Sequence, residues 1–380
     1  MEHYDVAVVG LGALGSAATY HLARRGARVV AFEQFELGHG NGASHDTSRI
    51  VRTSYGAERY VRLAQSAYRD WADLEHAAGE PLLTITGGVI MLPTAGPYRS
   101  RDFTTSLSAA GVPHELLEPG EVMARWPRLH VPDGVETVYT ADTGIAHAAR
   151  TVATLHRLAR EAGAELRERT PVVRIEPGGG QGVVVRLEGE RVRAGRLVLA
   201  TDAWTNELLE PLGVTIPLET MQEQVTYFQP GDPAAFAPGL FPVWIWEDEQ
   251  CFYGFPTYGD STIKAARDVS NNFMAPRERT FESSQALIEE LTGFVHARFP
   301  DAGPPMRTLT CQYALTPDRE FALGPLAEHP DVLVALAAGH GFKFTPAIGR
   351  ILAELALEGG TDDDISAFVP PVTARGEARA

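Results

Sequence analysis

The sequence predicts an α/β fold in which one sheet built from α/β units is interleaved with a second, β-rich unit. Three observations lead to this class. Near the N-terminus, a short apolar strand runs through a glycine turn into a helix. Comparable α/β segments recur in the middle and at the end of the chain, and two stretches between them contain strand-like runs of alternating residues. At 380 residues, the chain also exceeds the size of one typical domain.

The first βαβ unit has the pattern of a dinucleotide site. Its strand is Asp5 to Val9, its turn reads Gly10-Leu11-Gly12-Ala13-Leu14-Gly15, and its second strand, residues 27–32, ends at Glu33. Gly10 would permit the tight turn, Gly12 the approach of a pyrophosphate, and Gly15 the close packing of helix on strand. Glu33 suits a ribose 2′-hydroxyl and would repel the 2′-phosphate of NADP. The unit therefore predicts FAD or NAD, and the alternative is a glycine-rich turn without a ligand.

Apolar periodicity places the remaining elements. We expect helices over residues 60–75, 148–162, 281–298 and 347–357, and strands over 86–92, 172–175, 183–187, 196–201 and 332–337. The strands at 172–175 and 183–187 would form a hairpin with a glycine-rich turn. Residues 223–266 are β-rich, residues 38–49 are too polar for a core, and the tail after Pro371 is expected to fray.

Composition and charge narrow the class of partner. Hydrophobic residues make up 44% of the chain and charged residues 22%, which supports a packed core. The formal net charge of −16 would repel nucleic acid and anionic membrane surfaces, so we expect neither as a partner. No apolar run reaches the roughly 20 residues of a membrane span, and no signal peptide is expected, so a cytoplasmic location is predicted. Cys251 and Cys311 are too few for a disulfide framework or a zinc site, and no metal is predicted.

Four further motifs occur in an order that resembles one family. They are the segment from Asn41-Gly42 to Arg52, Tyr253-Gly254-Phe255-Pro256, Cys311-Gln312-Tyr313, and Gly339-His340-Gly341-Phe342-Lys343-Phe344. The chain resembles the sarcosine oxidase and N-methyltryptophan oxidase group within the glycine/D-amino-acid oxidase superfamily of flavoenzymes, over nearly its whole length. The resemblance implies FAD rather than NAD. It also implies an α/β (α+β) fold with a Rossmann-like FAD-binding domain (1–85, 146–220 and 306–380) interleaved with a β-rich substrate domain (86–145 and 221–305).

The resemblance implies a set of cofactor-binding residues. Cys311 would form a thioether to the 8α carbon of the flavin, and the backbone N–H groups of Gly341 and Phe342 would face its pyrimidine end. The full set of expected FAD-binding residues is Gly10, Gly12, Leu14, Gly15, Glu33, Gln34, Ser44, Thr47, Ser48, Arg49, Val173, Trp204, Cys311, Gly339, Gly341, Phe342 and Lys343.

Catalytic and substrate residues follow from the same matches. Lys264 would lie over the flavin and activate oxygen, because a fixed cation stabilises developing superoxide charge. Arg52 and Lys343 would pair with the substrate carboxylate. The expected catalytic residues are Lys264, Arg49, His45, Tyr253 and Tyr313, and the expected substrate-binding residues are Arg52, Lys343, Tyr253, Asp268 and Trp246. For each, an ordinary surface or core position is the alternative.

Three positions depart from the family pattern. Asp268 stands where sarcosine-type members have a histidine, which puts sarcosine itself in doubt. Asp202 replaces a usual glycine, and Gly324 a usual acid. Trp244 and Trp246 suggest an aromatic-lined pocket.

The function expected from these residues is an FAD-dependent oxidase of secondary amino acids, either N-methyl or cyclic. A hydride would pass from the carbon next to nitrogen to flavin N5, O₂ would be reduced to H₂O₂, and the imine would hydrolyse. The alternatives are a fructosyl-amino-acid or biosynthetic amine oxidase of the same fold, a flavin dehydrogenase that uses a carrier, and a binding protein with a vestigial fold. A monomer is expected.

Overall fold

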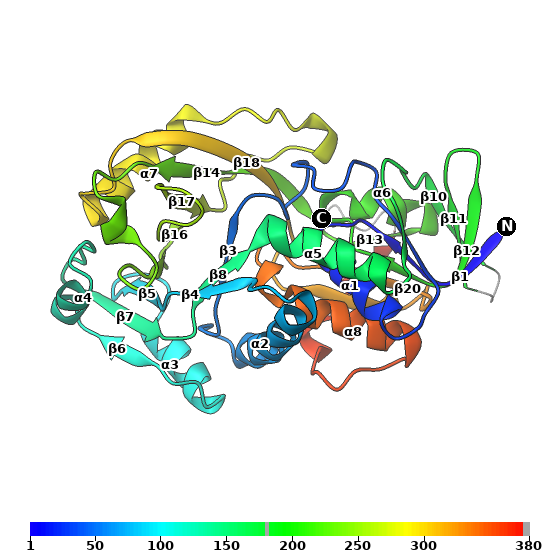
Figure 1. Cartoon of the computed structure of the whole chain (residues 1–380), viewed down its shortest axis with the longest axis horizontal. Coiled ribbons are helices and arrows are strands. Elements are labelled where there is room, and N and C mark those ends of the chain that lie inside the picture. The colour runs from blue at the N-terminus through cyan, green and yellow to red at the C-terminus, as the bar shows by residue number, and fades with distance from the viewer. Residues whose placement is uncertain (179–181, 375–380) are drawn as a thin grey trace.

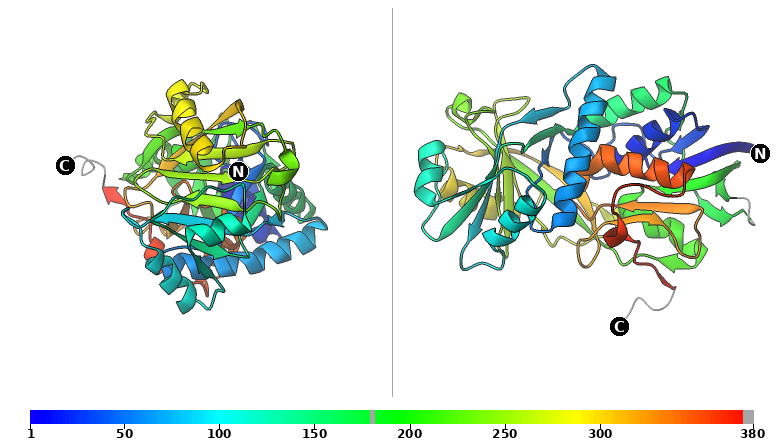
Figure 2. Two further views of the ribbon diagram at one scale, coloured as in Figure 1. Left: turned by 90° about the vertical axis from the view of Figure 1, so that its left-hand side faces the viewer. Right: turned by 90° about the horizontal axis from the view of Figure 1, so that it is seen from below.

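Two large sheets lie along the long axis of the molecule in a computed structural model that describes residues 1–178 and 182–374 (Figure 1). Helix α2 (Glu58–Ala78) runs between the two halves (Figure 2, right). It ends at Gly79, whose φ of 69° is the left-handed conformation typical of a helix C-terminus. None of the helices in the described ranges is long and apolar enough to cross a bilayer.

The first sheet contains the predicted βαβ unit and has eight strands. In its parallel strands β1, β2, β12 and β20, successive side chains point to opposite faces of the sheet. Val6 and Val8 pack toward α1 and α8, and Ala7 and Val9 pack into a second cluster on the other face. Both faces are buried, which explains why these strands read as continuous apolar runs. The order is β10 (Arg174–Pro177), β11 (Val183–Arg186), β12 (Arg191–Leu199), β1 (Glu2–Val9), β2 (Val29–Phe32), β9 (Glu165–Arg167), with β20 (Val332–Leu336) beside β12 and β19 (Ala322–Pro325) beside β20.

The second large sheet is mostly antiparallel and also has eight strands. Its order is β18 (Pro305–Leu315), β14 (Glu219–Phe228), β17 (Ile263–Asp268), β16 (Cys251–Phe255), β15 (Val243–Trp246), β5 (Gly88–Pro93), β7 (Val135–Thr140) and β6 (Glu115–Leu117). Strand β18 pairs with β14, so the predicted domain boundary at residue 306 falls at the start of this strand. The division into domains stays a prediction.

Smaller elements complete the fold. A three-stranded sheet, β3 (Ser48–Val51), β8 (Gly144–His147) and β4 (Leu83–Ile85), lies between the two large sheets (Figure 1). The other helices are α1 (Ala13–Ala23), α3 (Ser100–Ala109), α4 (Pro119–Arg125), α5 (Ala148–Glu161), α6 (Thr205–Leu209), α7 (Gln285–Arg298) and α8 (Thr345–Leu357). The predicted helices near residues 60, 148 and 347 and the predicted hairpin strands are confirmed.

Two expectations differ from the structure, and one lies outside it. The helix predicted from residue 281 begins at Gln285, because Phe281 has a φ of 61° and the Ser284 hydroxyl accepts the Leu287 N–H as a cap. The tail does not fray at once, since β21 (Thr373–Ala374) pairs with β13 (Val214–Thr215). The glycine turn of the hairpin falls on residues 179–181, outside the described residues.

Candidate active site

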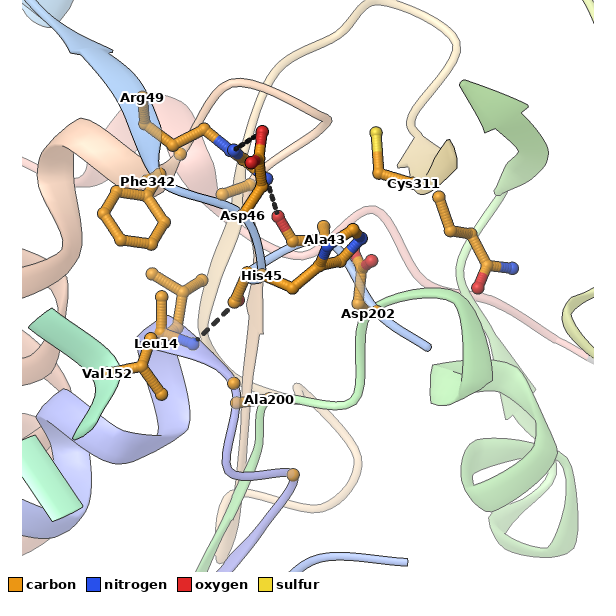
Figure 3. A pocket seen from close by; sticks show the side chains of 18 of the residues that line it. Leu14, Ala43, His45, Asp46, Arg49, Val152, Ala200, Asp202, Cys311 and Phe342 are labelled. Atoms are coloured by element: carbon orange, nitrogen blue, oxygen red, sulfur yellow. Dashed lines mark hydrogen bonds and ion pairs between the residues drawn. The ribbon is translucent and has the colours of Figure 1, made fainter. Parts of the chain in front are cut away.

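A cavity of about 540 Å³ is lined by residues of both large sheets and of the small sheet between them. It includes the glycine turn after β1, the polar segment 42–52, the end of β12, and one face of the second large sheet. In Figure 3, Cys311 and Arg49 lie toward one side of this pocket, and Leu14, Val152 and Ala200 toward the other. The cavity therefore joins the predicted dinucleotide turn to the predicted catalytic side chains.

The glycine turn has the geometry of a phosphate-binding cradle. Gly10 has a φ of 90°, and a Cβ at Gly15 would collide with the Gly10 carbonyl oxygen. A Cβ at Gly12, by contrast, would meet only the Ser44 side chain, at 3.0 Å from Oγ. The Ser44 hydroxyl also accepts the Ala13 N–H at 2.9 Å. The turn therefore requires glycine at position 10, and close packing requires it at position 15. Gly12 instead leaves the backbone open to a ligand, so the cradle fits a pyrophosphate.

Glu33 lies buried at the end of β2 and lines the cavity. Its carboxylate accepts the N–H groups of Leu11 at 2.9 Å and Phe35 at 3.1 Å, and His39 Nε2 lies 3.4 Å away. Burial opposes ionisation, but the hydrogen bond from His39 and those from the backbone outweigh it and lower the pKa of Glu33. Glu33 is therefore an ionised acceptor where a ribose hydroxyl is expected.

Lys264 on β17 is the buried cation of the site. Its Nζ donates to Asp46 Oδ2 at 3.0 Å and to the Ser48 carbonyl at 2.7 Å. Tyr227 donates its hydroxyl to Asp46 Oδ1 at 2.5 Å. Burial lowers the pKa of Lys264 to about 8, although the Asp46 carboxylate opposes this shift. Asp46, which the sequence reasoning passed over, thus keeps a buried ammonium charged near neutral pH.

Arg49 and His45 flank this pair. Arg49 donates to the carbonyls of Ser48 at 2.9 Å and Ala43 at 2.8 Å, and its guanidinium lies 6.0 Å from the Phe342 ring. Burial, reinforced by the Arg49 cation, lowers the pKa of His45 to about 4, so its ring is neutral at physiological pH. His45 Nε2 is buried and has no hydrogen-bond partner among the described residues. A neutral imidazole with a free ring nitrogen fits a hydrogen bond to a bound flavin.

Cys311 on β18 lines the same cavity and is buried, whereas a sulfur that reacts as a thiolate is usually accessible. Burial raises the pKa of its thiol to about 11, and the Arg49 cation opposes that rise. The sulfur is therefore a protonated thiol at neutral pH.

The far end of the cavity collects charged side chains. Arg52 Nη2 lies 3.9 Å from Glu247 Oε1, and Asp268 Oδ2 accepts a hydrogen bond at 2.8 Å from Nη1 of Arg319, which lies behind the cavity wall. Lys343 Nζ donates to the His340 carbonyl at 2.7 Å. Burial and then the Arg52 cation lower the pKa of Lys343 well below its usual value. The sequence reasoning missed Glu247 and Arg319, for which no motif gave a signal. The aromatic rings of Tyr253 and Tyr313 line the cavity as well.

Several residues expected at the site do not line the cavity. Trp246 and Trp244 point to the opposite face of β15, into the core cluster against α7, and Ile245 takes the cavity side because strand residues alternate. Val173 is 63% exposed, and its neighbour Val172 lines the cavity instead. The Thr47 side chain is exposed, with its hydroxyl 3.4 Å from that of Tyr227. Gly15 does not line the cavity either, since it packs against the Gly10 carbonyl, and the remaining expected cofactor residues line it, including Gln34, Trp204 and Gly339.

The remaining departures from the family pattern have different settings. Asp202 lies in the short 3₁₀ helix η1 (Asp202–Trp204) with a φ of 46°, and its side chain lines the cavity. Gly324 lies in β19 with a φ of 132°, a conformation that favours glycine, and pairs with Val334. Gly324 therefore has a backbone reason for being glycine.

Fold and site together define a dinucleotide-dependent oxidoreductase. A βαβ cradle with an ionised acid lies at one end of the cavity, and the buried cations Lys264, Arg52 and Lys343 lie toward the other. The model of the family "FAD dependent oxidoreductase" (DAO) matches residues 5–355. The chain belongs to this family and is an FAD-dependent amine oxidoreductase. The expected fold class and family are confirmed.

Several known proteins are similar to this chain. Monomeric sarcosine oxidase of Streptomyces avermitilis is 36% identical over 97% of both chains, and peroxisomal sarcosine oxidase of Homo sapiens is 31% identical over 96% of this chain and 95% of its own. N-methyl-L-tryptophan oxidase of Salmonella arizonae is 29% identical over 96% of this chain and 98% of its own. Among solved structures, a variant of NikD, an unusual amino acid oxidase essential for nikkomycin biosynthesis, superposes with a TM-score of 0.87 at 28% identity and covers 100% of both chains.

Proposed function

We propose that this enzyme oxidises secondary amino acids, N-methyl or cyclic, with O₂ as the electron acceptor, and releases an imine and H₂O₂. The observation that carries the proposal is the single cavity that connects the glycine cradle, the buried Lys264 and the two cations Arg52 and Lys343. The names of the similar proteins, which include sarcosine oxidases and an N-methyl-L-tryptophan oxidase, support the substrate class.

FAD, when bound, supplies the group that accepts a hydride from the carbon next to the substrate nitrogen and returns the electrons to O₂. Gly12, Ser44 and Glu33 would hold its adenosine diphosphate half. His45, Arg49 and the backbone of Gly341 and Phe342 would hold its ring system.

The charges at the far end of the cavity favour a substrate with a neutral amine. Three cations, Arg52, Arg319 and Lys343, lie near two carboxylates, Glu247 and Asp268. One substrate carboxylate brings the net charge of this group to zero, whereas a protonated amine would add a buried, unpaired positive charge. Arg52 and Lys343 bind the carboxylate, and the rings of Tyr253 and Tyr313 enclose the amine. No side chain has to act as a strong base.

The test is reduction of the bound flavin by a panel of substrates in the absence of air. Sarcosine, larger N-methyl amino acids, L-proline, L-pipecolate and fructosyl amino acids are each mixed with the purified yellow protein, with the primary amino acids as controls. We expect N-methyl or cyclic members to bleach the flavin and air to restore it with one H₂O₂ per turnover. Bleaching only by fructosyl amino acids would favour that alternative, and bleaching without rapid recovery in air would favour a carrier-dependent dehydrogenase. A protein that takes up no flavin would be a vestigial binding protein.

We further propose that Cys311 forms a thioether with the flavin: the thiol and the 8α methyl group would each lose a hydrogen, and O₂ would accept the two electrons and two protons as H₂O₂. Cys311 lines the cavity, and although burial raises the pKa of its thiol, the nearby Arg49 cation opposes that rise and so favours the thiolate that the reaction needs. We expect the yellow colour to stay on the polypeptide after acid precipitation of the wild type and to be released from Cys311→Ser. Cys251→Ser is the matched control, since the other cysteine also lines the cavity but should leave the colour attached. Release of flavin from the acid-treated wild type would contradict the link.

A monomer and a cytoplasmic location stay predictions. Several similar proteins are named monomeric sarcosine oxidase, which supports the first. Sedimentation of the purified holoprotein measures it directly.

A further inference from the structure

We infer that Asp202 and Gln312 bind the hydroxyl groups of the polyol (ribityl) chain that joins the two halves of FAD. Both side chains line the cavity, and neither has a role in the proposed chemistry. The family cofactor is the only ligand that the inference requires.

Gln312 is the most completely unpartnered polar side chain at the cavity. It is 1% exposed, and neither its amide nitrogen nor its amide oxygen has a hydrogen-bond partner among the described residues. A buried amide without partners is costly, so native proteins satisfy such groups with water or a ligand. The amide offers one donor group and one acceptor, which is also what each hydroxyl of a polyol offers.

Asp202 presents a second unpartnered group. Its Oδ2 is buried without a hydrogen bond from any described residue, and the residue has a φ of 46°, a left-handed conformation that aspartate tolerates. Burial raises the pKa of this carboxyl to about 7, so at neutral pH it can both donate and accept. A buried carboxyl oxygen without a partner indicates a position where a ligand completes the hydrogen bonding.

Asp202 and Gln312 lie where the middle part of the cofactor would pass. Asp202 follows β12, whose last residues lie against the glycine turn: the Ala200 N–H donates to the Val9 carbonyl at 2.9 Å. The same short helix η1 packs against β18, the strand of Cys311 and Gln312. Figure 3 shows Asp202 in the region between Ala200 and Cys311. A ligand with phosphates at the glycine turn and a ring system at Cys311 must pass its linking chain through this region.

The test measures cofactor affinity, not turnover. Asp202→Gly and Gln312→Leu are made in a Cys311→Ser background, so that FAD binds reversibly whether or not the wild type is covalent. Binding of FAD and of ADP to each apoprotein is then titrated. ADP lacks the ribityl chain but occupies the phosphate cradle. We expect the dissociation constant of FAD to rise at least about tenfold in each variant, because a lost hydrogen bond to a charged or buried group costs at least that much affinity. The dissociation constant of ADP should stay unchanged.

Two further variants keep the test decisive. Asp202→Asn retains the shape and one acceptor oxygen and tolerates the left-handed backbone, so we expect a smaller loss than with glycine. Gln250→Leu removes an exposed glutamine outside the cavity and should leave FAD affinity unchanged. Unchanged FAD affinity in both Asp202→Gly and Gln312→Leu would overturn the inference. Equal loss of FAD and ADP affinity would overturn it too, since the contact would then be to the phosphate half.

Discussion

Replacing Lys264 with methionine should slow the reaction of the reduced enzyme with O₂ by about 10²- to 10³-fold, the effect of removing one fixed charge that stabilises a transition state. Methionine keeps the length and apolar stem of lysine and removes only the ammonium. That ammonium is buried and held by Asp46 and the Ser48 carbonyl, so it need not reorganise when negative charge develops on oxygen. The rate is measured by mixing the photoreduced enzyme with buffers of known O₂ concentration in a stopped-flow instrument.

The anaerobic reduction of the flavin by substrate is the internal control, because it should change far less in Lys264→Met than reoxidation does. The pH dependence is a second check. Burial lowers the pKa of Lys264 to about 8, and the cation is the form below that pKa. Reoxidation of the wild type should therefore slow as the pH rises through about 8, whereas the variant should lack this step. An unchanged reoxidation rate in Lys264→Met would show that oxygen reacts elsewhere.

The parts of the site that could be predicted from sequence are those fixed by local geometry or by a family motif. Gly10, Gly12 and Gly15 follow from the turn alone, because each glycine has a separate steric reason. Lys264 and Lys343 needed the resemblance, since a lone lysine in a sequence carries no signal of burial. All five of these residues line the cavity or shape its wall.

The rest depends on contacts between distant segments. The role of Asp46 depends on its contact with Lys264 of β17, which the sequence does not indicate. The role of Glu247, at the end of β15, likewise depends on its proximity to Arg52. Trp246 shows a different limit. It lies in the stretch that was predicted to be β-rich, but the direction of its side chain depends on which face of the sheet α7 covers. An error of one residue in the position of a strand moves each predicted side chain to the opposite face of the sheet, here from the cavity to the core.

Replacing Lys343 with methionine should weaken binding of a carboxylate substrate by about 10²-fold or more, because one partner of a buried ion pair is lost. The ammonium is buried, and among the described residues it donates a hydrogen bond to the His340 carbonyl alone, so a substrate carboxylate is its natural counter-ion. The dissociation constant is measured from the substrate dependence of anaerobic flavin reduction. The limiting rate of reduction should change less than the affinity, since the residue binds the substrate without contacting the reacting carbon.

Proton uptake separates this role from a purely structural one. Burial and the Arg52 cation lower the pKa of Lys343 in the empty cavity, and a bound carboxylate would raise it again. Binding of a carboxylate without an amine, such as acetate, to the wild type should therefore take up a proton, and its affinity should fall as the pH rises through the range where free Lys343 loses its charge. An amine-free ligand is needed because a substrate that binds as a neutral amine releases a proton of its own. Calorimetry in buffers of different ionisation enthalpy detects this proton. Lys343→Met should lack the uptake, and a variant that binds weakly yet takes up the same proton would assign the titration to another group.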